Sequence, residues 1–239
     1  MFKKISLMIL SVVCLQAFEL KSWYLGNIDN TNYNLKNTKE ISKYTSKNFD
    51  AMCLQGINGE EAIKSISSNK QYLANLDSKL AFLVKNSYKE VELIAYDDPN
   101  NIFLNKPQIL LLKDVDLTLI NYLASDDPEQ RLKEIKEINN IYFTLKGKYN
   151  ISNKRILTCG NFKENYGFVK REISDLYSVA NNNGTVVDPK FGYSNYDYDH
   201  IISLHDLKAT PDETLLNEYR DYKKFIDEIS PHIPINLKL

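Results

Sequence analysis

Short apolar runs separated by polar or turn-forming segments recur along the chain, and each run is only a few residues long. Runs of this length that end near Gly, Asn, Asp or Pro predict buried β-strands rather than helices. The predicted strands cover residues 20–28, 80–85, 91–96, 109–112, 117–123, 156–160 and 185–187. The second and third of these are close enough in sequence to predict a β-hairpin.

Apolar residues at helical spacing alternate with these strands. Asp127 followed by Pro128 predicts an N-cap and a first helical residue, and apolar positions continue from there to residue 145. Thr210 to Glu213 predicts a capping box with Pro211 as the first helical residue, for a helix that runs to Glu228. Weaker helical patterns cover residues 35–44 and 168–179. The mixture predicts an α+β protein.

The N-terminus has a different pattern. Lys3 and Lys4 precede an apolar run over residues 5–17, and the chain turns polar at Glu19. This is the layout of a secretory signal peptide, and the run is short for a membrane span. We therefore expect residues 1–17 to be a signal peptide and residues 18–239 a single domain. The protein would be exported, to the periplasm or the medium, without a membrane span; a buried N-terminal segment is the alternative.

Composition and charge indicate the number of domains and limit the kinds of partner that we expect. The chain has 239 residues, 43% of them apolar, and shows no repeat or Pro/Ser-rich linker, which favours one domain with one large core. Its formal net charge is −1, and removal of the two N-terminal lysines makes it −3. Nucleic-acid binders usually carry a basic face, so this charge argues against nucleic acid as a partner.

The run Ile156-Leu157-Thr158-Cys159-Gly160-Asn161-Phe162-Lys163 is a strand that ends in polar side chains. It resembles the I-L-x-x-G-D-F-N strand end of the endonuclease/exonuclease/phosphatase family, which has the DNase I-like fold. Further segments resemble other landmarks of that family, in the same order along the chain. They are residues 23–28 (W-Y-L-G-N-I), 50–56 (D-A-M-C-L-Q-G), 117–123 (L-T-L-I-N-Y-L), 198–203 (Y-D-H-I-I-S) and 230–235 (S-P-H-I-P-I).

The resemblance implies a two-sheet αββα sandwich with a cleft at one end of both sheets. It also implies hydrolysis of phosphate esters with a divalent cation, which a Glu holds while His and Asp residues move protons and Asn residues position groups. Four positions match the family: Asn27, Asn121, Asp199 and His232. Five family positions are substituted, and they hold Gly56, Leu123, Asn161, Lys163 and Pro231.

Together with the N-terminal pattern, these substitutions predict an exported, catalytically degenerate protein that binds a ligand or forms a complex, as toxin subunits of this fold do with companion proteins. His232, Asn121 and Asp199 are the retained catalytic positions, and we expect neither a metal ion nor another cofactor. Asn27, Asn161 and Lys163 are the predicted anion-binding residues, although Lys163 pointing to solvent is an equal alternative. The alternative function is a Mg²⁺-dependent phosphodiesterase or phosphatase with a rearranged site, which would need Asp29, Glu60, Glu61, His200 or His205.

Two further features leave alternatives open. Cys53 and Cys159 form a pair in a chain expected to be exported, but the resemblance places them in different sheets. Packed sheets lie about 10 Å apart and a disulfide needs Cα atoms within about 7 Å, so we expect two free thiols. The tyrosines at residues 193–198 predict either a ligand-stacking surface or rings packed on their own domain.

Overall fold

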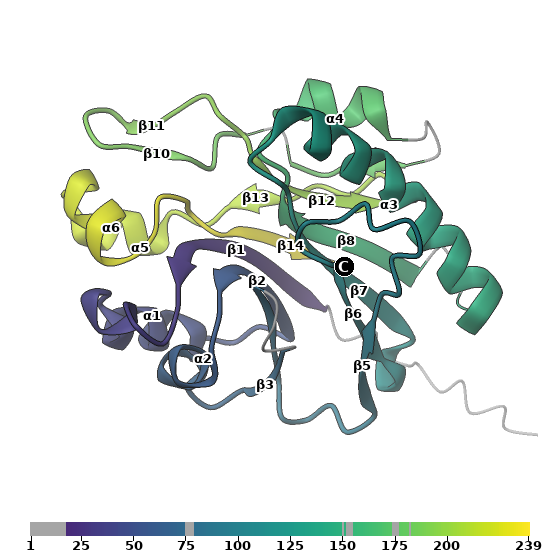
Figure 1. Ribbon diagram of the computed structural model, residues 1–239. Helices are drawn as coiled ribbons and strands as arrows, with labels where there is room; N and C mark the ends of the chain where they lie inside the picture. Colours follow the sequence, from purple (N-terminus) through teal and green to yellow (C-terminus); the bar gives the residue numbers. More distant parts are fainter. Residues whose placement is uncertain (1–17, 75–78, 150, 152–154, 174–176, 182) are drawn as a thin grey trace, which may run out of the picture.

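A computed structural model describes residues 18–74, 79–149, 151, 155–173, 177–181 and 183–239. The predicted signal peptide at residues 1–17 lies outside the described residues. Within those residues the chain forms two six-stranded sheets packed face to face, with helices on both outer faces (Figure 1). This is the predicted two-sheet αββα sandwich, so the fold prediction is confirmed.

The first sheet carries the N- and C-terminal strands side by side. Its order is β13-β14-β1-β2-β4-β3. The long strand β1 (Glu19–Ile28) runs parallel to β2 (Ala51–Ile57) and antiparallel to β14 (Ile235–Lys238). Two strands follow β2 to one edge, β4 (Leu80–Val84) and β3 (Gln71–Ala74), and the short β13 (Thr210–Pro211) lies at the other edge.

The second sheet has the order β5-β6-β7-β8-β12-β9. The antiparallel strands β5 (Val91–Ala95), β6 (Gln108–Leu112) and β7 (Leu117–Leu123) form a meander. Strand β8 (Ile156–Asn161) then runs parallel to β7 and antiparallel to β12 (Asp199–Ser203), and β9 (Ser178–Val179) closes the edge. A separate two-stranded hairpin contains β10 (Val187–Asp188) and β11 (Gly192–Tyr193).

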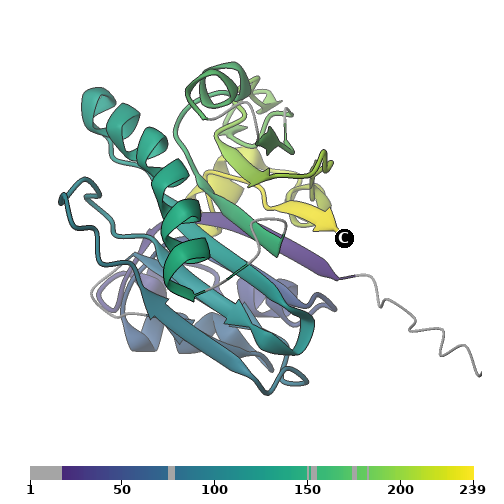
Figure 2. The ribbon, with the colours of Figure 1, turned by 90° about the vertical axis from the view of Figure 1, so that its right-hand side faces the viewer.

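Helices cover each sheet on its outer face. Against the first sheet pack α1 (Thr38–Thr45), α2 (Glu60–Ser67), α5 (Thr214–Tyr219) and α6 (Tyr222–Glu228). Against the second pack α3 (Pro128–Tyr149) and α4 (Tyr166–Glu172). Short 3-10 turns cover Tyr33–Leu35 and Lys113–Val115. In the turned view of Figure 2, α3 lies obliquely across the outside of its sheet.

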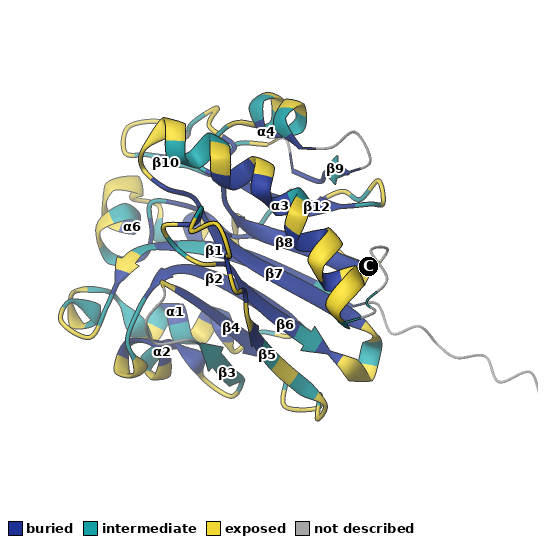
Figure 3. Cartoon of the chain, turned by 45° about the vertical axis from the view of Figure 1, so that its right-hand side comes forward, coloured by how far each residue is buried: buried dark blue, intermediate teal, exposed yellow. Residues whose placement is uncertain are grey.

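The buried residues form three apolar layers, one under each helical face and one between the sheets. The central strands are buried along most of their length, whereas the edge strands β3 and β5 are only partly buried and α3 keeps an exposed outer side (Figure 3). The predicted N-cap of this helix is confirmed, because Asp127 Oδ1 accepts a hydrogen bond of 2.7 Å from the Gln130 amide. Within the described residues, no helix is both long and apolar enough to cross a membrane.

The hairpin prediction for residues 80–96 is wrong. Strand β4 pairs with β2 and β3 in the first sheet, whereas β5 pairs with β6 in the second. The intervening residues cross from one sheet to the other, so these two strands never pair. Short apolar runs carry no information on which sheet receives them, and proximity in sequence was a misleading guide here.

Two helix predictions in the second half also need correction. Thr210 and Pro211 form strand β13 against β14, and the helix begins only at Thr214, whose amide and hydroxyl donate to Asp212. The helix predicted to reach Glu228 is two helices, because Arg220 has a left-handed backbone (φ 55°) that ends α5. The helix predicted at residues 168–179 is shorter and earlier, as α4, and residues 178–179 form β9 instead.

The expectation of two free thiols is wrong as well. Cys53 and Cys159 form a disulfide that joins β2 to β8 across the inter-sheet layer, with Cα atoms 6.5 Å apart. The 10 Å spacing is an average over larger side chains. Here both facing residues are small cysteines, and the two strands approach each other closely enough for a bond.

Candidate functional site

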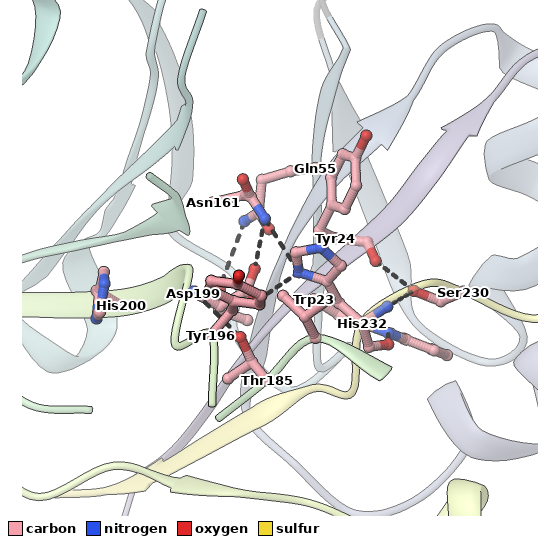
Figure 4. Close-up of polar contacts among 12 residues, drawn as sticks. Trp23, Tyr24, Gln55, Asn161, Thr185, Tyr196, Asp199, His200, Ser230 and His232 are labelled. Carbon is pink, nitrogen blue, oxygen red and sulfur yellow. Dashed lines mark hydrogen bonds and ion pairs between the residues drawn. The ribbon is translucent and has the colours of Figure 1, made fainter. Parts of the chain in front are cut away.

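A pair of buried side chains, Asp199 and His232, marks the candidate site. Asp199 begins β12, and His232 lies in the segment just before β14. Oδ2 of Asp199 is 2.6 Å from Nδ1 of His232. The amide nitrogen of Asn161, at the end of β8, lies 3.1 Å from both Asp199 Oδ1 and His232 Nδ1 (Figure 4). Three of the predicted site residues therefore meet, and we call them the dyad cluster.

Strand register brings the dyad cluster together. The antiparallel pairing of β12 with β8 sets Asp199 opposite Asn161. His232 is held by its main chain: its carbonyl accepts a 2.9 Å hydrogen bond from Trp23 Nε1, and its amide donates to Ser230 Oγ. Ser230 in turn donates to the main-chain oxygen of Tyr24. Because Asp199 accepts at Nδ1, Nε2 of His232 is the nitrogen that can exchange a proton with a ligand.

Tyrosine rings surround the imidazole of His232. The ring centroid of Tyr24 lies 4.9 Å from it, edge-on, and that of Tyr198 lies 6.4 Å away. Tyr196 follows at 5.4 Å from Tyr198 and is 57% exposed. Burial raises the pKa of Tyr24, and the negative charges of Asp126 and Asp199 add to this effect. Tyr24 therefore stays a neutral phenol beside the dyad cluster.

Gly56 occupies the position where the resemblance places a metal-binding Glu. Its backbone is left-handed (φ 72°), and a Cβ added there would lie 2.7 Å from Tyr24 Cε2 and 2.9 Å from the Asn27 amide nitrogen. Gly26 and Asn27 also have positive φ, at the point where the pairing of β1 with β2 shifts register. The ring of Tyr24 thus fills the space that a longer side chain at position 56 would need.

The other predicted site residues lie outside the dyad cluster. Asn121 is buried, and its amide donates to the Leu54 and Ala81 carbonyls and accepts from Gln55 Nε2, so its contacts link the two sheets. Asn27 is exposed at the end of β1. Nζ of Lys163 lies 2.6 Å from Asp126 Oδ1 rather than pointing freely to solvent.

Two buried amide oxygens near the cluster are unsatisfied. Asn121 fixes the orientation of Gln55, because its oxygen can only accept and must face the Gln55 nitrogen. Asp199 fixes the orientation of Asn161 in the same way. Gln55 Oε1 and Asn161 Oδ1 are then left without a hydrogen-bond partner among the described residues. Buried acceptors are usually paired, so these two oxygens can accept a hydrogen bond from a water molecule or a ligand.

The residues that a rearranged hydrolytic site would recruit are dispersed. Glu60 and Glu61 pair with Lys64 on the exposed first turns of α2. Asp29 accepts hydrogen bonds from Thr31, and the His200 ring contacts the main-chain oxygens of Asn181 and Glu164. Among the described residues, no group of three or more His, Cys, Asp and Glu side chains is arranged to hold a metal ion.

Comparison with known proteins decides the fold. No family model and no curated protein sequence matches this chain. Among solved structures, a Caenorhabditis elegans TDP2 is similar to this chain, with 15% sequence identity and a TM-score of 0.63. The match covers 93% of this chain and 75% of the TDP2 chain. This chain has the DNase I-like fold. A mannosyl-6-phosphatase of Bacteroides thetaiotaomicron (12% identity, TM-score 0.60, 93% and 99% coverage) shares it.

A Bacteroides vulgatus endonuclease/exonuclease/phosphatase protein has the same DNase I-like fold, at 9% identity and a TM-score of 0.64, with 93% of this chain and 98% of its own covered. At such low identity the likeness establishes the fold and no activity. The sequence did not indicate Tyr24, Trp23, Ser230 or Asp126 as parts of the site. Their one signal is position: Trp23 and Tyr24 lie within the landmark that contains Asn27, and Ser230 lies within the landmark that contains His232. Asp126 follows the landmark that ends at Leu123.

Proposed function

We propose that this chain is an exported, catalytically degenerate protein of the DNase I-like fold that acts by binding a ligand or a partner protein. The observation that carries the proposal is the contact between Gly56 and Tyr24. A side chain at position 56 would have to displace the Tyr24 ring and approach the Asn27 main chain. The site is therefore packed as an aromatic and amide surface where a metal-binding carboxylate would otherwise stand.

The remaining groups do not suit a magnesium ion. Mg²⁺ requires near-octahedral oxygen coordination, usually with one or two carboxylates. Both oxygens of Asp199 are already engaged, one by Asn161 and one by His232. Lys163 adds a positive charge next to the site, paired with Asp126. These contacts support a site without a metal ion, and we derive no reaction step through one.

Acid–base chemistry also lacks a second partner. Asp199 and His232 form one proton-transfer pair, but Leu123 is buried at the end of β7 where the resemblance places the other His. Loss of one general acid–base group typically costs a factor of about 10² to 10⁴ in rate. Together with a missing metal site, this supports binding rather than turnover.

The proposed ligand carries a negative charge. Lys163 supplies a cation, His232 supplies a second one when it is protonated, and the exposed Asn27 supplies an amide. The amide nitrogen of Asn161 already contacts Asp199 and His232. A phosphate, a sulfate or an acidic side chain of a partner protein has the required chemistry. The net charge of −1 argues against nucleic acid, which needs a broad basic face.

A hydrolysis assay tests the proposal directly. The mature protein should neither nick supercoiled DNA nor release phosphate from phosphate monoesters with Mg²⁺, Mn²⁺ or Ca²⁺. Mass spectrometry of the exported protein should find a chain that begins at Phe18. Metal-dependent turnover that disappears in His232→Ala would refute the degenerate assignment.

One observation favours the alternative, a rearranged hydrolase. The 2.6 Å contact between Asp199 and His232 is short enough to orient and polarise an imidazole. A functioning site would bind Mg²⁺, and ligand binding to the native state raises stability by about 2.7 kcal/mol at 100 times Kd. We expect millimolar Mg²⁺ to leave the melting temperature unchanged. A rise of several degrees that Asp199→Ala abolishes would support the hydrolase instead.

A further inference from the structure

The amine that the proposed function assigns to anion binding already has a negative partner. Nζ of Lys163 lies 2.6 Å from Oδ1 of Asp126. The Lys163 side chain is 21% exposed, whereas that of Asp126 is 96% exposed. The lysine side chain is thus partly buried near the surface, and the exposed carboxylate lies on its solvent side. This is the position from which an anionic ligand would approach.

The main chain presents both residues in fixed places. Asp126 follows β7 and Lys163 follows β8, two parallel neighbouring strands whose ends are joined by a hydrogen bond from the Ala124 amide to the Asn161 oxygen. The guanidinium of Arg131 donates to the main-chain oxygen of Asp126 at 3.0 Å and to the Glu164 carboxylate at 2.8 Å. One arginine therefore ties the two loops together.

The carboxylate of Asp126 also acts on the dyad cluster. Its charge contributes to the raised pKa of Tyr24, after burial and ahead of Asp199. Tyr24 in turn contacts the His232 ring at 4.9 Å. In the other direction, the hydrogen bond and charge of Lys163 lower the pKa of Asp126, so this carboxylate stays ionised under ordinary conditions. The Lys163–Asp126 pair and the dyad cluster thus belong to one electrostatic site.

We propose that Asp126 is a specificity-determining residue of this site: its carboxylate occupies the anion position on Lys163 and admits dianions in preference to monoanions. This inference rests on the proposed anion-binding function. A tethered carboxylate competes at an effective concentration of about millimolar or above. A singly charged ligand offers Lys163 no more charge than Asp126 does, whereas sulfate or a phosphate-monoester dianion offers twice as much. The pair is at the surface, so its exchange is cheap.

The test uses the single tryptophan of the chain as a reporter. The Trp23 indole donates to the carbonyl of His232, so its one indole NMR signal reports on the dyad cluster. Wild type, Asp126→Asn and Lys163→Gln would be titrated with sodium sulfate and with sodium acetate at constant ionic strength. Asp116→Asn is the matched control, because Asp116 is 80% exposed and pairs with Arg155 instead.

We expect wild type and Asp116→Asn to bind sulfate and to ignore acetate. Asp126→Asn should bind both anions, with sulfate affinity higher by about threefold or more, since a surface ion pair no longer competes. Lys163→Gln should lose both. Equal affinities in wild type and Asp126→Asn, with loss in Lys163→Gln, would overturn the role of Asp126 and leave the anion site intact.

A second readout does not depend on ligand binding. Acetylation of the Lys163 amine, followed by peptide mass spectrometry, should proceed about threefold or more faster in Asp126→Asn than in wild type or Asp116→Asn, because the surface pair no longer covers the amine. An unchanged rate would overturn the inference, since it would show that Asp126 does not cover the amine. Faster acetylation without saturable anion binding in any variant would overturn the proposed anion function, and with it the selectivity.

Discussion

Two fully buried carboxylates, Glu134 and Asp199, belong to the second sheet and the helix that covers it, yet their surroundings differ. Glu134 on α3 accepts three hydrogen bonds, from the Leu104 and Ser125 amides at 2.9 Å and from the Tyr122 hydroxyl at 3.0 Å. Asp199 on β12 accepts from Asn161 and from the ring nitrogen of His232. Both residues have 0% exposure, so burial alone does not separate them.

Glu134 and Asp199 differ in the groups that donate hydrogen bonds to them. The donors to Glu134 are main-chain amides and a phenol whose pKa burial and the Glu134 charge raise well above the ordinary value, so none of these protons leaves near neutral pH. Asp199 instead hydrogen-bonds one nitrogen of the His232 imidazole, whose second nitrogen can contact a ligand. Asn161, whose nitrogen contacts Asp199, has an unsatisfied amide oxygen. Glu134 therefore has a structural role, because it links three neighbouring segments by hydrogen bonds. Asp199 belongs to a site that can respond to a ligand.

We expect the largest change in stability when the hydrogen bonds of Glu134 are removed. Glu134→Ala leaves the buried Ser125 amide, the buried Tyr122 hydroxyl and the part-buried Leu104 amide without their acceptor, and each buried group costs about 1 to 3 kcal/mol. We expect the free energy of unfolding to fall by about 3 kcal/mol or more, measured by urea denaturation. Glu129→Ala, at an exposed position of the same helix, is the control and should change it by less than about 0.5 kcal/mol. Similar losses in both variants would contradict the assignment.

A pair of glycines sharpens the same comparison. Gly56→Ala puts a methyl group at positive φ against the Tyr24 ring, and we expect a loss of about 1 to 3 kcal/mol in unfolding free energy. Gly147, on the same helix as Glu134, has nothing within 4 Å of an added Cβ. Gly147→Ala should therefore stabilise by about 0.5 to 1 kcal/mol. If Gly56→Ala were also stabilising, Tyr24 would not fill the space beside position 56.

Acid titration tests a third carboxylate, which is paired with a lysine. Burial raises the pKa of Asp212, but hydrogen bonds from Lys21, Thr214 and Tyr44 lower it further than burial raises it. A lowered pKa in the folded state gives stability that is present above about pH 4 and is lost as the pH falls below that value. We expect unfolding free energy to drop on acidification, and to drop less in Asp212→Asn. An equal drop in both proteins would show that Asp212 does not contribute to the loss of stability in acid.

The smallest effect on stability separates two surface ion pairs. Lys148 lies 2.9 Å from Asp97 on the α3 flank, with side chains 53% and 75% exposed. Exposed pairs contribute about 0 to 1 kcal/mol, so Lys148→Ala and Lys163→Ala should both leave the melting temperature nearly unchanged. Only Lys163→Ala should abolish sulfate binding, followed by the Trp23 indole signal. Loss of binding in Lys148→Ala would place the anion elsewhere.

The sequence predicts the central strands well because their apolar runs are buried on both faces, against the other sheet on one side and against helices on the other. It also predicts the convergence of Asn161, Asp199 and His232, since a family resemblance supplies the order of the strand ends. It fails at residues 80–96, because two short apolar runs are compatible both with a hairpin and with a crossover from one sheet to the other. Pairing partners depend on the packing of the whole chain, which no local pattern contains.

The site shows a similar limit. Gly56 is visible in the sequence as a missing carboxylate, but the Tyr24 ring that takes its space is visible only in three dimensions. Tyr24 precedes a bulge with left-handed residues at Gly26 and Asn27, and this bulge moves the edge of β1 relative to β2. Likewise, the prediction for Lys163 could not include Asp126, because the two residues are brought together by the parallel pairing of β7 with β8.

The disulfide between Cys53 and Cys159 has a consequence for proteolysis. The two cysteines are 106 residues apart and belong to different sheets. A single peptide-bond cleavage at any loop between them leaves both fragments covalently attached. Such a nicked protein would migrate as an intact chain in a non-reducing gel and as two bands after reduction. The chain therefore tolerates a cut that would allow the two fragments to separate if its cysteines were reduced.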